Sequence, residues 1–431
     1  MDTKELSSPV ASGATPGTSS MSFNHPADPM NIVPQLERAC GIDIHKEKVV
    51  VYFYIRDQLE QVKEYSTFTC DLEQIRTDIQ SHAIKKVIME STGVYWIALC
   101  AVLTMGDIDV CVVNPKFVKN MPKEKTDKKD ARWLCKIFVN GMVRNSFVVS
   151  ESQRAFRDLC RMRTKYSQHV TQTLNRVLKN LERRNIKLRS VVSNMDTQSG
   201  HDIVNAIANG ESDIEKLVAL CKGKLKKKKD LMRKALHGVI TDHDRMMLKT
   251  LMKDITHFRE QIAELEKEIA VHVNSTQPGI AEKLQQVKGI GPKSAEIILA
   301  EVGDNVKPFK TPDKLTAWVG LAPGNHDTAD KKKYVGTRDG NKYLRTTMIQ
   351  VAWAAVRTKN SYWRSLYYHL TRRIPMKKAI VAVARKLMRV IYKIISGDMK
   401  QYVEYGGDYF IRRLQQRLEQ KTNHNITLKQ A

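Results

Sequence analysis

The chain has 431 residues, and its 72 Lys and Arg outnumber its 46 Asp and Glu, which gives a formal net charge of +26. Hydrophobic residues make up 42% of the sequence, so the chain can build packed cores and is not a disordered polycation. The charge argues against an acidic small-molecule enzyme and for a polyanionic partner, which would be DNA, RNA or an acidic membrane surface. At about 150 residues per domain, the length predicts two or three domains.

The sequence gives no sign of a membrane protein. No segment approaches the roughly 18–20 apolar residues that a spanning helix needs, since Lys and Arg interrupt the apolar segment 379–395. Met1 is followed by acids and a Ser/Pro/Gly-rich stretch, not by the apolar core of a signal peptide. The 7 cysteines are scattered and form no CxxC, which is typical of reduced thiols in the cytosol. We therefore expect a cytoplasmic protein with no membrane partner.

The N-terminal part predicts a tail followed by an α/β domain. Residues 1–37 are rich in Ser, Pro, Thr, Gly and Ala, which indicates a flexible tail. Residues 38–150 alternate β-branched runs with helical segments. They predict strands at 40–44, 48–55 and 63–68, a helix at 72–82, a strand at 86–89, a helix at 95–105, a strand at 110–113 and a helix from residue 127. This order predicts a mixed central sheet with helices packed against it.

Residues 151–275 predict a basic helical region. Its first stretch carries many cations and few acids, and we expect seven of the cations to contact nucleic acid: Arg154, Arg161, Lys165, Arg176, Lys179, Arg183 and Arg184. A second cationic run spans Lys222–Lys229. From 242 to 274, apolar residues recur at helical steps: Leu248, Leu251, Ile255, Phe258, Ile262, Leu265 and Ile269. This pattern predicts a coiled-coil seam or, alternatively, a helix that packs on its own domain.

A third region, 276–400, predicts a mostly helical domain, and residues 401–431 predict a polar tail. Near its start, VKGIGPKSA predicts a helix-hairpin-helix. In such a motif Gly289 and Gly291 let the backbone approach a nucleic-acid phosphate, the next helix's amides donate to it, and Lys288 and Lys293 add positive charge. The alternative is a tight turn between helices that binds no ligand.

The segment 320–345 is a long basic loop that leads into a helix, which is the profile of a functional loop. Asn341 is placed to cap that helix or to donate to a phosphate, and Arg345 is able to clamp a phosphate. The alternative is a disordered surface loop.

Four acids form the strongest candidate for catalysis. Asp43 lies inside an apolar strand, and Glu90 ends another. Asp127 and Asp130 are three residues apart at a helix start, so they share one helix face. Acids that converge in this way can hold two Mg²⁺ (or Mn²⁺) ions about 3.5–4 Å apart, as phosphodiester chemistry requires. Taken singly, each acid also has a structural interpretation as a turn or cap residue.

These residues resemble a known family. The segments GIDIHKEKVVV, ESTGVYW and VNPKFVKNMPKEKTDKKDA, followed by VKGIGPKSAEIILAEVG, WVGLAPGN and GNKYLR, are similar to the DEDD transposases of the insertion-sequence "one-ten" type. That family includes the pilin-inversion recombinases. The resemblance spans roughly residues 39–400, in the family's order.

The resemblance implies a function beyond what the spacing indicates. It implies an RNase H/RuvC-like N-terminal domain with a divalent-metal site at the four acids, and a helical coiled-coil region that assembles a homodimer or homotetramer. It also implies a nucleophilic serine, supplied by the C-terminal domain beside another protomer's acids, that attacks DNA and forms a covalent intermediate. The partners would be donor DNA, target DNA and a structured noncoding guide RNA, the bridge RNA. Such a protein would work at the nucleoid of a prokaryote.

The chain departs from that family at the nucleophile. Relatives carry Ser in the segment after the GLAP motif, whereas this chain has Thr328 there and no serine between Ser294 and Ser361. Threonine can act as a nucleophile when a base or metal deprotonates it, although its β-branch restricts the attack. Three interpretations follow: Thr328 is the nucleophile, Thr337 or Tyr334 takes its place, or the chain has lost recombination.

The sequence therefore predicts a guide-RNA-directed DNA transposase. Two alternatives are a RuvC-like structure-specific nuclease that uses water and forms no covalent intermediate, and a non-catalytic nucleic-acid-binding remnant.

Overall fold

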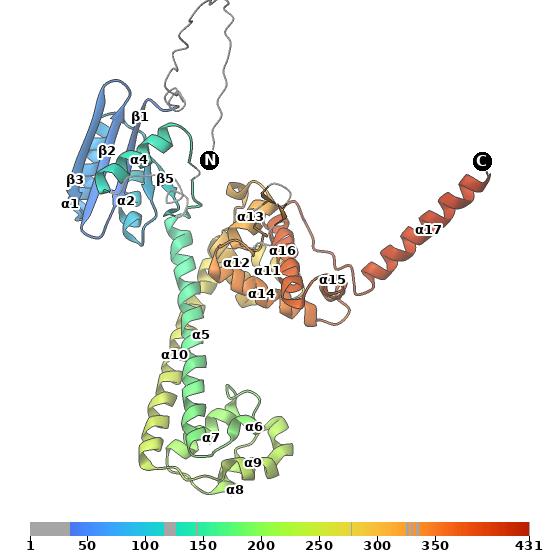
Figure 1. Ribbon diagram of the computed structural model, residues 1–431. Helices are drawn as coiled ribbons and strands as arrows, with labels where there is room; N and C mark the ends of the chain where they lie inside the picture. Colours follow the sequence, from blue (N-terminus) through green and yellow to red (C-terminus); the bar gives the residue numbers. More distant parts are fainter. Residues whose placement is uncertain are drawn as a thin grey trace, which may run out of the picture. The chain divides into compact units, whose positions relative to one another are not determined.

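The computed structural model describes residues 35–115, 126–143, 145–276, 278–324, 327–328, 331–332 and 336–430. The chain divides into two compact units, Met1–Val148 and Val149–Ala431. The first holds a sheet with helices, and the second is mostly helical (Figure 1). This division confirms the expectation of an α/β region followed by helical regions.

The N-terminal unit is a five-stranded mixed sheet with the order β3-β2-β1-β4-β5. Strands β1, β2 and β3 pair antiparallel, whereas β1, β4 and β5 pair parallel. Its elements are β1 (Arg38–Ile44), β2 (Lys48–Ile55), β3 (Leu59–Ser66), α1 (Thr69–Ser81), β4 (Lys86–Glu90), α2 (Tyr95–Thr104), β5 (Asp109–Val113) and α4 (Asp127–Val139). They follow one another in the predicted order.

Alternation along the strands builds three layers. Cys40, Ile42 and Ile44 point to the face covered by α1 and α2, where they join one apolar cluster. Ala39 and, on the neighbouring strand, Ile88 point to the opposite face, which α4 covers. Because successive side chains of a strand face opposite ways, Gly41 and Asp43 share the α4 face with Ala39.

Gly41 sets how closely α4 approaches β1. A Cβ atom at this position would lie 2.1 Å from the Ala131 carbonyl oxygen and 2.7 Å from the Cys135 amide nitrogen. Only glycine leaves room for the helix backbone there. The close approach holds the first turn of α4 over the end of β1.

The C-terminal unit begins with a long helical hairpin. Helix α5 (Glu151–Arg183) and helix α10 (Asp242–Thr276) run side by side in opposite directions (Figure 1). Phe156 stacks on His272 at one end, with ring centroids 4.3 Å apart, and Arg184 bonds Asp244 at 2.6 Å near the other. The segment of the chain that joins α5 to α10 contains α6 (Leu188–Val191), α7 (Gln198–Ala208), α8 (Ile214–Ala219), the 3-10 turn η1 (Gly223–Lys228) and α9 (Lys229–Leu236).

The apolar seam of α10 is used within the chain. Leu248, Leu251 and Ile255 are buried in one cluster with residues of α5 and α7, and Phe258 and Ile262 pack against it. Of the two interpretations of the seam, the structure shows the second, a helix that packs on its own domain. Pairing of protomers stays a prediction, and this seam gives no support for it.

The remaining helices surround α16. They are α11 (Ile280–Gln285), α12 (Pro292–Val302), η2 (Lys307–Phe309), α13 (Pro312–Val319), α14 (Lys342–Arg357), α15 (Tyr362–Thr371), α16 (Met376–Ile395) and α17 (Tyr409–Gln430), with the short strands β6 (Asp327–Thr328) and β7 (Lys331–Lys332) before α14. Helices α11, α13, α14 and α15 all contact α16. The segment expected as a polar tail thus contains a helix, α17. Among the described residues, no helix is long and apolar enough to cross a membrane.

Candidate functional site

Two of the candidate acids end neighbouring parallel strands. Ile42 of β1 is paired with Met89 of β4, so Asp43 and Glu90 follow at the same step of the register. Glu90 shares a face with Ile88, which packs on α4, just as Asp43 shares a face with Gly41. Both carboxylates therefore emerge on the α4 side at the carboxyl ends of their strands.

The other two acids lie in the first turn of α4. The hydroxyl of Thr126 caps the helix by accepting from the Lys129 amide at 3.3 Å, so the helix begins at Asp127. The positive end of the helix dipole favours carboxylates at Asp127 and Asp130. Because α4 lies over β1 at Gly41, this turn is placed beside Asp43.

The structure brings Asp43 and Asp127 together through a histidine. His45 Nε2 lies 3.1 Å from Asp43 Oδ2 and 3.4 Å from Asp127 Oδ1. One ligand atom from each of the three residues lies within 4.8 Å of the others. Lys48 contacts the second oxygen of Asp127. His45 was not among the sequence candidates, although its place two residues after Asp43 was a signal that both share a face.

Glu90 and Asp130 flank this group but do not belong to it. The Thr92 hydroxyl donates to Glu90 Oε1 at 3.0 Å. Asp130 is half-buried and close enough to act electrostatically on Asp43. The four predicted acids are thus gathered on one face, with Asp43 and Asp127 closest to a shared position.

The electrostatics of the group fit a cation. Burial raises the pKa of Asp43; His45 opposes this shift, while the Asp130 and Asp127 carboxylates reinforce it. A hydrogen bond from Lys48 lowers the pKa of Asp127. The Lys48 ammonium therefore already offsets part of the negative charge of this group. Carboxylate oxygens suit Mg²⁺ or Mn²⁺, and the imidazole nitrogen of His45 adds a ligand that suits transition metals.

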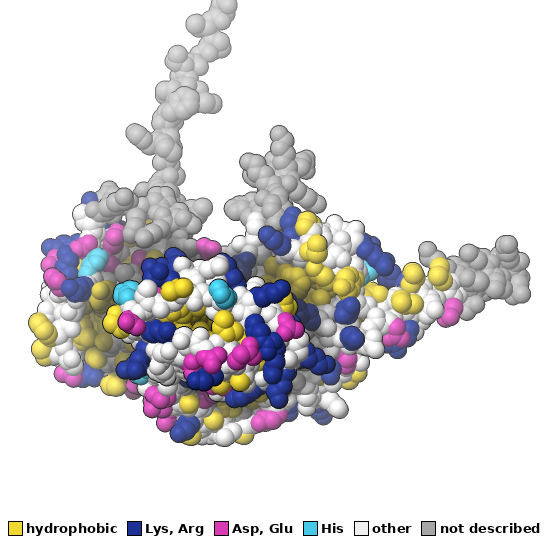
Figure 2. Space-filling model, turned by 90° about the horizontal axis from the view of Figure 1, so that it is seen from below, with side chains coloured by type: hydrophobic (Ala, Val, Ile, Leu, Met, Phe, Trp, Pro, Cys, Tyr) yellow, Lys and Arg dark blue, Asp and Glu magenta, His cyan; other side chains and the backbone are white. Residues whose placement is uncertain are grey.

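Four of the predicted nucleic-acid contacts form an exposed stripe on α5. Lys165, Arg176, Lys179 and Arg183 are exposed and lie on one face, since their separations of 11, 3 and 4 residues are each close to a whole number of helical turns. Arg154 is half-buried near the start of the same helix. Figure 2 shows Lys and Arg spread over the face seen there, with Asp and Glu among them.

Arg161 and Arg184 are instead engaged in ion pairs within the fold. Arg161 forms a two-pronged pair with Glu301 at 2.7 and 2.8 Å. Arg184 bonds Asp244, whose side chain is fully buried. These contacts are sufficient to explain both arginines structurally, and nucleic-acid binding by them stays a prediction.

Glu301 is the centre of a buried polar network that the sequence did not indicate. Its side chain is 1% exposed and receives, besides Arg161, an ion pair from Arg157 at 3.2 Å and a hydrogen bond from Asn341 Nδ2 at 2.6 Å. The Asn341 side-chain oxygen caps α14 by accepting from the amides of Tyr343 and Leu344, both at 3.1 Å. Of the two roles expected for Asn341, the structure shows the cap.

A short turn joins α11 and α12, as both interpretations of this segment expect. Gly289 has φ +93°, and a Cβ there would lie 2.6 Å from both the Val351 oxygen and the Ala355 nitrogen of α14. Gly291, by contrast, is exposed with open space beside it. Lys288 is exposed, and Lys293 pairs with Glu266 at 2.5 Å. Gly289 thus serves helix packing, and Gly291 is the glycine that a phosphate can approach.

The candidate nucleophile lies on a short hairpin. The backbone of Thr328 pairs with that of Lys331 in the two-residue strands β6 and β7, and its side chain lies outside the described residues, as does Tyr334. Thr337 pairs with Pro323 through an isolated bridge. Arg345, in the first turn of α14, is half-buried.

Comparison with protein families gives two matches in chain order. A DEDD, IS110-type model described as "Transposase" matches residues 40–186, and one described as "Transposase IS116/IS110/IS902 family" matches residues 281–369. The chain belongs to the IS110-type transposases. The first match runs from β1 to just past the end of α5, and the second from α11 into α15.

The curated proteins that this chain resembles are also named as transposases. A probable family 20 transposase of Pseudomonas aeruginosa is 32% identical over 156 residues, which is 35% of this chain and 45% of that protein. The transposase of insertion sequence element IS1111A from Coxiella burnetii is 27% identical over 36% of this chain and 43% of its own. A putative transposase of Sinorhizobium fredii, y4pF/y4sB, is 33% identical over 29% and 33%. The matched part spans less than half of each relative.

Proposed function

We propose that this IS110-type transposase cuts and rejoins DNA at a divalent-metal site held by Asp43, Glu90, Asp127 and Asp130. The observation that carries the proposal is the convergence of Asp43, His45 and Asp127 within 4.8 Å of one another. Strand β1 supplies Asp43, the turn after it supplies His45 and helix α4 supplies Asp127, so the site depends on the folded domain. An RNase H/RuvC-like relationship is consistent with the mixed sheet and with strand-end acids facing a helix.

A bound divalent ion would activate the attacking oxygen and stabilise the leaving one. The chain's own residues position the side chains that would hold this ion. Asp43 is held buried on the sheet, Gly41 lets α4 bring Asp127 to it, and the Thr126 cap fixes the start of that helix. His45 and Lys48 contact Asp127 and hold its two oxygens in place.

The proposed nucleophile is Thr328, in the position where the resembling family carries serine. Its attack on a phosphodiester would join the threonine oxygen to phosphorus and release a DNA hydroxyl, which takes the proton. Thr328→Ala should abolish a covalent protein–DNA adduct, and Thr328→Ser should keep it. An adduct that persists in the Ala variant would assign the attack to another hydroxyl, such as Thr337 or Tyr334.

The proposed partners are donor DNA, target DNA and a structured noncoding guide RNA, bound by a homodimer or homotetramer. The exposed stripe Lys165, Arg176, Lys179 and Arg183 supports a polyanionic partner, because each phosphate contact releases counterions. Binding to such partners should weaken steeply as salt rises. RNA that copurifies with the protein, sequenced and compared with DNA flanking the gene, tests the guide.

The decisive test is strand cleavage with Mg²⁺ by the full chain and by Asp127→Asn. Loss of several kcal/mol of transition-state stabilisation predicts a decrease of about a thousandfold or more. Asp230→Asn, which removes an acid from an exposed position, is the matched control and should cleave normally. Equal cleavage by wild type and Asp127→Asn would refute the metal site. Cleavage without any adduct would favour the water-using nuclease.

A further inference from the structure

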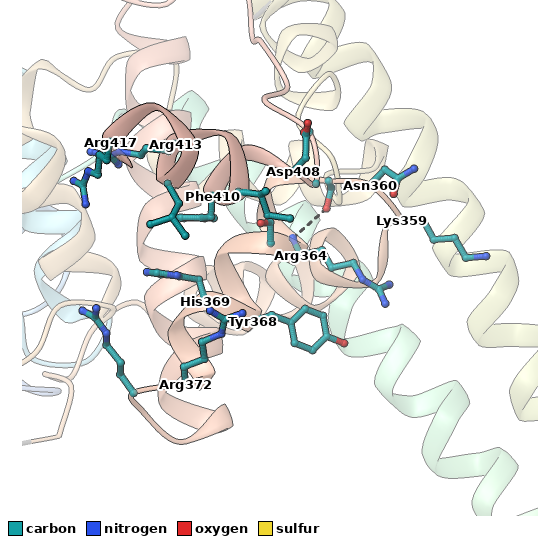
Figure 3. Close-up of a pocket in the computed structure, with 17 residues that line it drawn as sticks. Lys359, Asn360, Arg364, Tyr368, His369, Arg372, Asp408, Phe410, Arg413 and Arg417 are labelled. Carbon is teal, nitrogen blue, oxygen red and sulfur yellow. Dashed lines mark hydrogen bonds between the residues drawn. The ribbon is translucent and has the colours of Figure 1, made fainter. Parts of the chain in front are cut away.

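A basic cavity at the end of the second matched segment lies between α15 and the start of α17. Its volume is about 1390 Å³. Figure 3 shows Tyr368 and His369 of α15, with Arg372 just past the end of that helix, across from Phe410, Arg413 and Arg417 of α17. Both α16 and α17 lie beyond residue 369, where the second family match ends. We name this feature the α15–α17 groove.

The charge of the groove is one-sided. Its lining includes six Lys or Arg side chains and one acid, Asp408, which pairs with Arg412 on its own helix at 2.9 Å. Among the described residues, none of the six lining cations forms an ion pair: Lys359, Arg364, Arg372, Arg373, Arg413 and Arg417. Repulsion between these charges is left uncompensated within the described chain, which favours an anionic occupant.

Helix periodicity explains how the cations come to face one cavity. Arg364 and Tyr368 on α15 and Arg372, which ends that helix in helical conformation, follow at steps of four residues, so they form one row. On α17, Arg413 and Arg417 form a second row at the same step. Each step rises about 6 Å, so the two rows present several positive charges along the groove.

The floor of the groove is apolar and aromatic. The His369 and Phe410 rings stack with centroids 4.4 Å apart and planes 7° apart. Tyr368 is 53% exposed, with the Arg364 guanidinium 5.6 Å from its ring centroid. Ile411 and Leu414 add exposed apolar surface to the same lining. A free inorganic anion has no apolar or aromatic part that could pack against these side chains.

We propose that the α15–α17 groove binds single-stranded nucleic acid, with the arginines on phosphates and the aromatic floor under bases. Single-strand binding sites combine a positive groove with aromatic side chains on which bases stack. A duplex hides its base faces and would contact the cations alone. The proposal rests on the proposed function, in that a transposase opens and holds strands. It adds a site that neither the acidic centre nor the α5 stripe includes.

The test measures binding of a fluorescein-labelled mixed-sequence 20-mer by the full chain, as single-stranded RNA, single-stranded DNA and duplex DNA. Arg372→Ala/Arg413→Ala should weaken binding of a single strand by about tenfold or more. It should also reduce the slope of log affinity against log salt by about 1.4, at roughly 0.7 per phosphate contact. The RNA and DNA strands distinguish the two sources of this chemistry.

Two further variants separate charge from stacking. Phe410→Leu keeps an apolar side chain, so it should lower single-strand affinity severalfold without changing the salt slope or duplex affinity. Lys249→Ala/Lys253→Ala removes two exposed cations from α10 and is the matched control for charge. Its single-strand affinity should stay within about twofold of wild type.

Several outcomes would overturn the proposal. Groove variants that bind the single strand as tightly as wild type would exclude the site, as would equal losses on single strand and duplex. A change from oligomer to monomer in light scattering, with nucleic-acid affinity unchanged, would assign the groove to a second copy of the chain. Groove variants that keep both wild-type single-strand affinity and Mg²⁺-dependent cleavage would refute this inference and leave the proposed acidic site standing.

Discussion

Removing the carboxylate of Glu301 should destabilise the C-terminal unit more than any surface substitution. Glu301 is 1% exposed, and it joins Arg157 and Arg161 of α5 to Asn341 at the start of α14. In Glu301→Ala, Arg157, which is 13% exposed, and Arg161, which is 32% exposed, would lose their counter-ion. An unpaired buried charge is costly because water cannot replace the lost partner.

The magnitude follows from these contacts. Breaking a buried ion pair by removing one partner costs about 3–5 kcal/mol. Part of that cost is recovered here because Arg161 can turn to solvent, so we expect about 3 kcal/mol for Glu301→Ala. Glu301→Gln keeps one acceptor oxygen and the packing, so it should cost less, about 1–2 kcal/mol.

Urea unfolding followed by circular dichroism gives the loss of stability, and hydrogen exchange resolves where it occurs. Protection should fall in α12, in the first turn of α14 and in the start of α5, where Gln153 also bonds the Leu299 and Ala300 carbonyls. Glu419→Ala, at an exposed position on α17, is the control. A loss of less than about 1 kcal/mol in the free energy of unfolding for Glu301→Ala would refute the reasoning, because a value that small is typical of solvent-exposed ion pairs.

Three other predictions concern the same fold. Gly41→Ala should lower the free energy of unfolding in urea by about 1–3 kcal/mol, since its Cβ would push α4 away from β1. The same displacement should reduce Mg²⁺-dependent cleavage. Gly336→Ala is the control, because a Cβ at Gly336 would meet open space. Gly289→Ala should destabilise by a similar amount, whereas Gly291→Ala should leave stability within about 0.5 kcal/mol; equal effects would refute the packing argument. Despite the opposing effect of burial, hydrogen bonds from Thr241 and Arg184 lower the pKa of Asp244 from its ordinary 3.8 to about 2. A carboxylate whose pKa is lower in the folded than in the unfolded state stabilises the fold above the unfolded pKa. About 2 kcal/mol of the free energy of unfolding should therefore be lost as pH falls from about 4 to 2, and Asp244→Asn should flatten that part of the pH profile of stability.

Much of the α/β unit could be predicted because its signals are local. The β-branched runs located the strands, and the alternation of Asp43 between Ile42 and Ile44 placed its side chain on the opposite face. The third strand begins earlier than expected, at Leu59, because Leu59 pairs with Ile55 across a tight turn. No local pattern of residues 59–62 indicates that pairing.

The candidate site was predicted in part, and what was missed depends on contacts between distant residues. The sequence supplied the four acids but not His45, whose role appears only when α4 brings Asp127 to it. It counted Arg161 and Arg184 among free cations, since charge composition does not reveal partners 140 and 60 residues away. Two of the cations that line the α15–α17 groove, Arg413 and Arg417, likewise lie in the segment 401–431 that was expected as a polar tail.

The α5–α10 hairpin has a consequence for how such a protein can evolve. The chain leaves along α5 and returns along α10, so residues at the start of α5 meet α12 although more than 140 positions separate them. Everything at the distant end of the hairpin, from α6 to α9, is bypassed by that contact. Insertions, deletions or exchange of those helices would therefore leave Gln153 and Arg157 in register with α12. The contact between α5 and α12 is therefore independent of the length of the segment that joins the two hairpin helices.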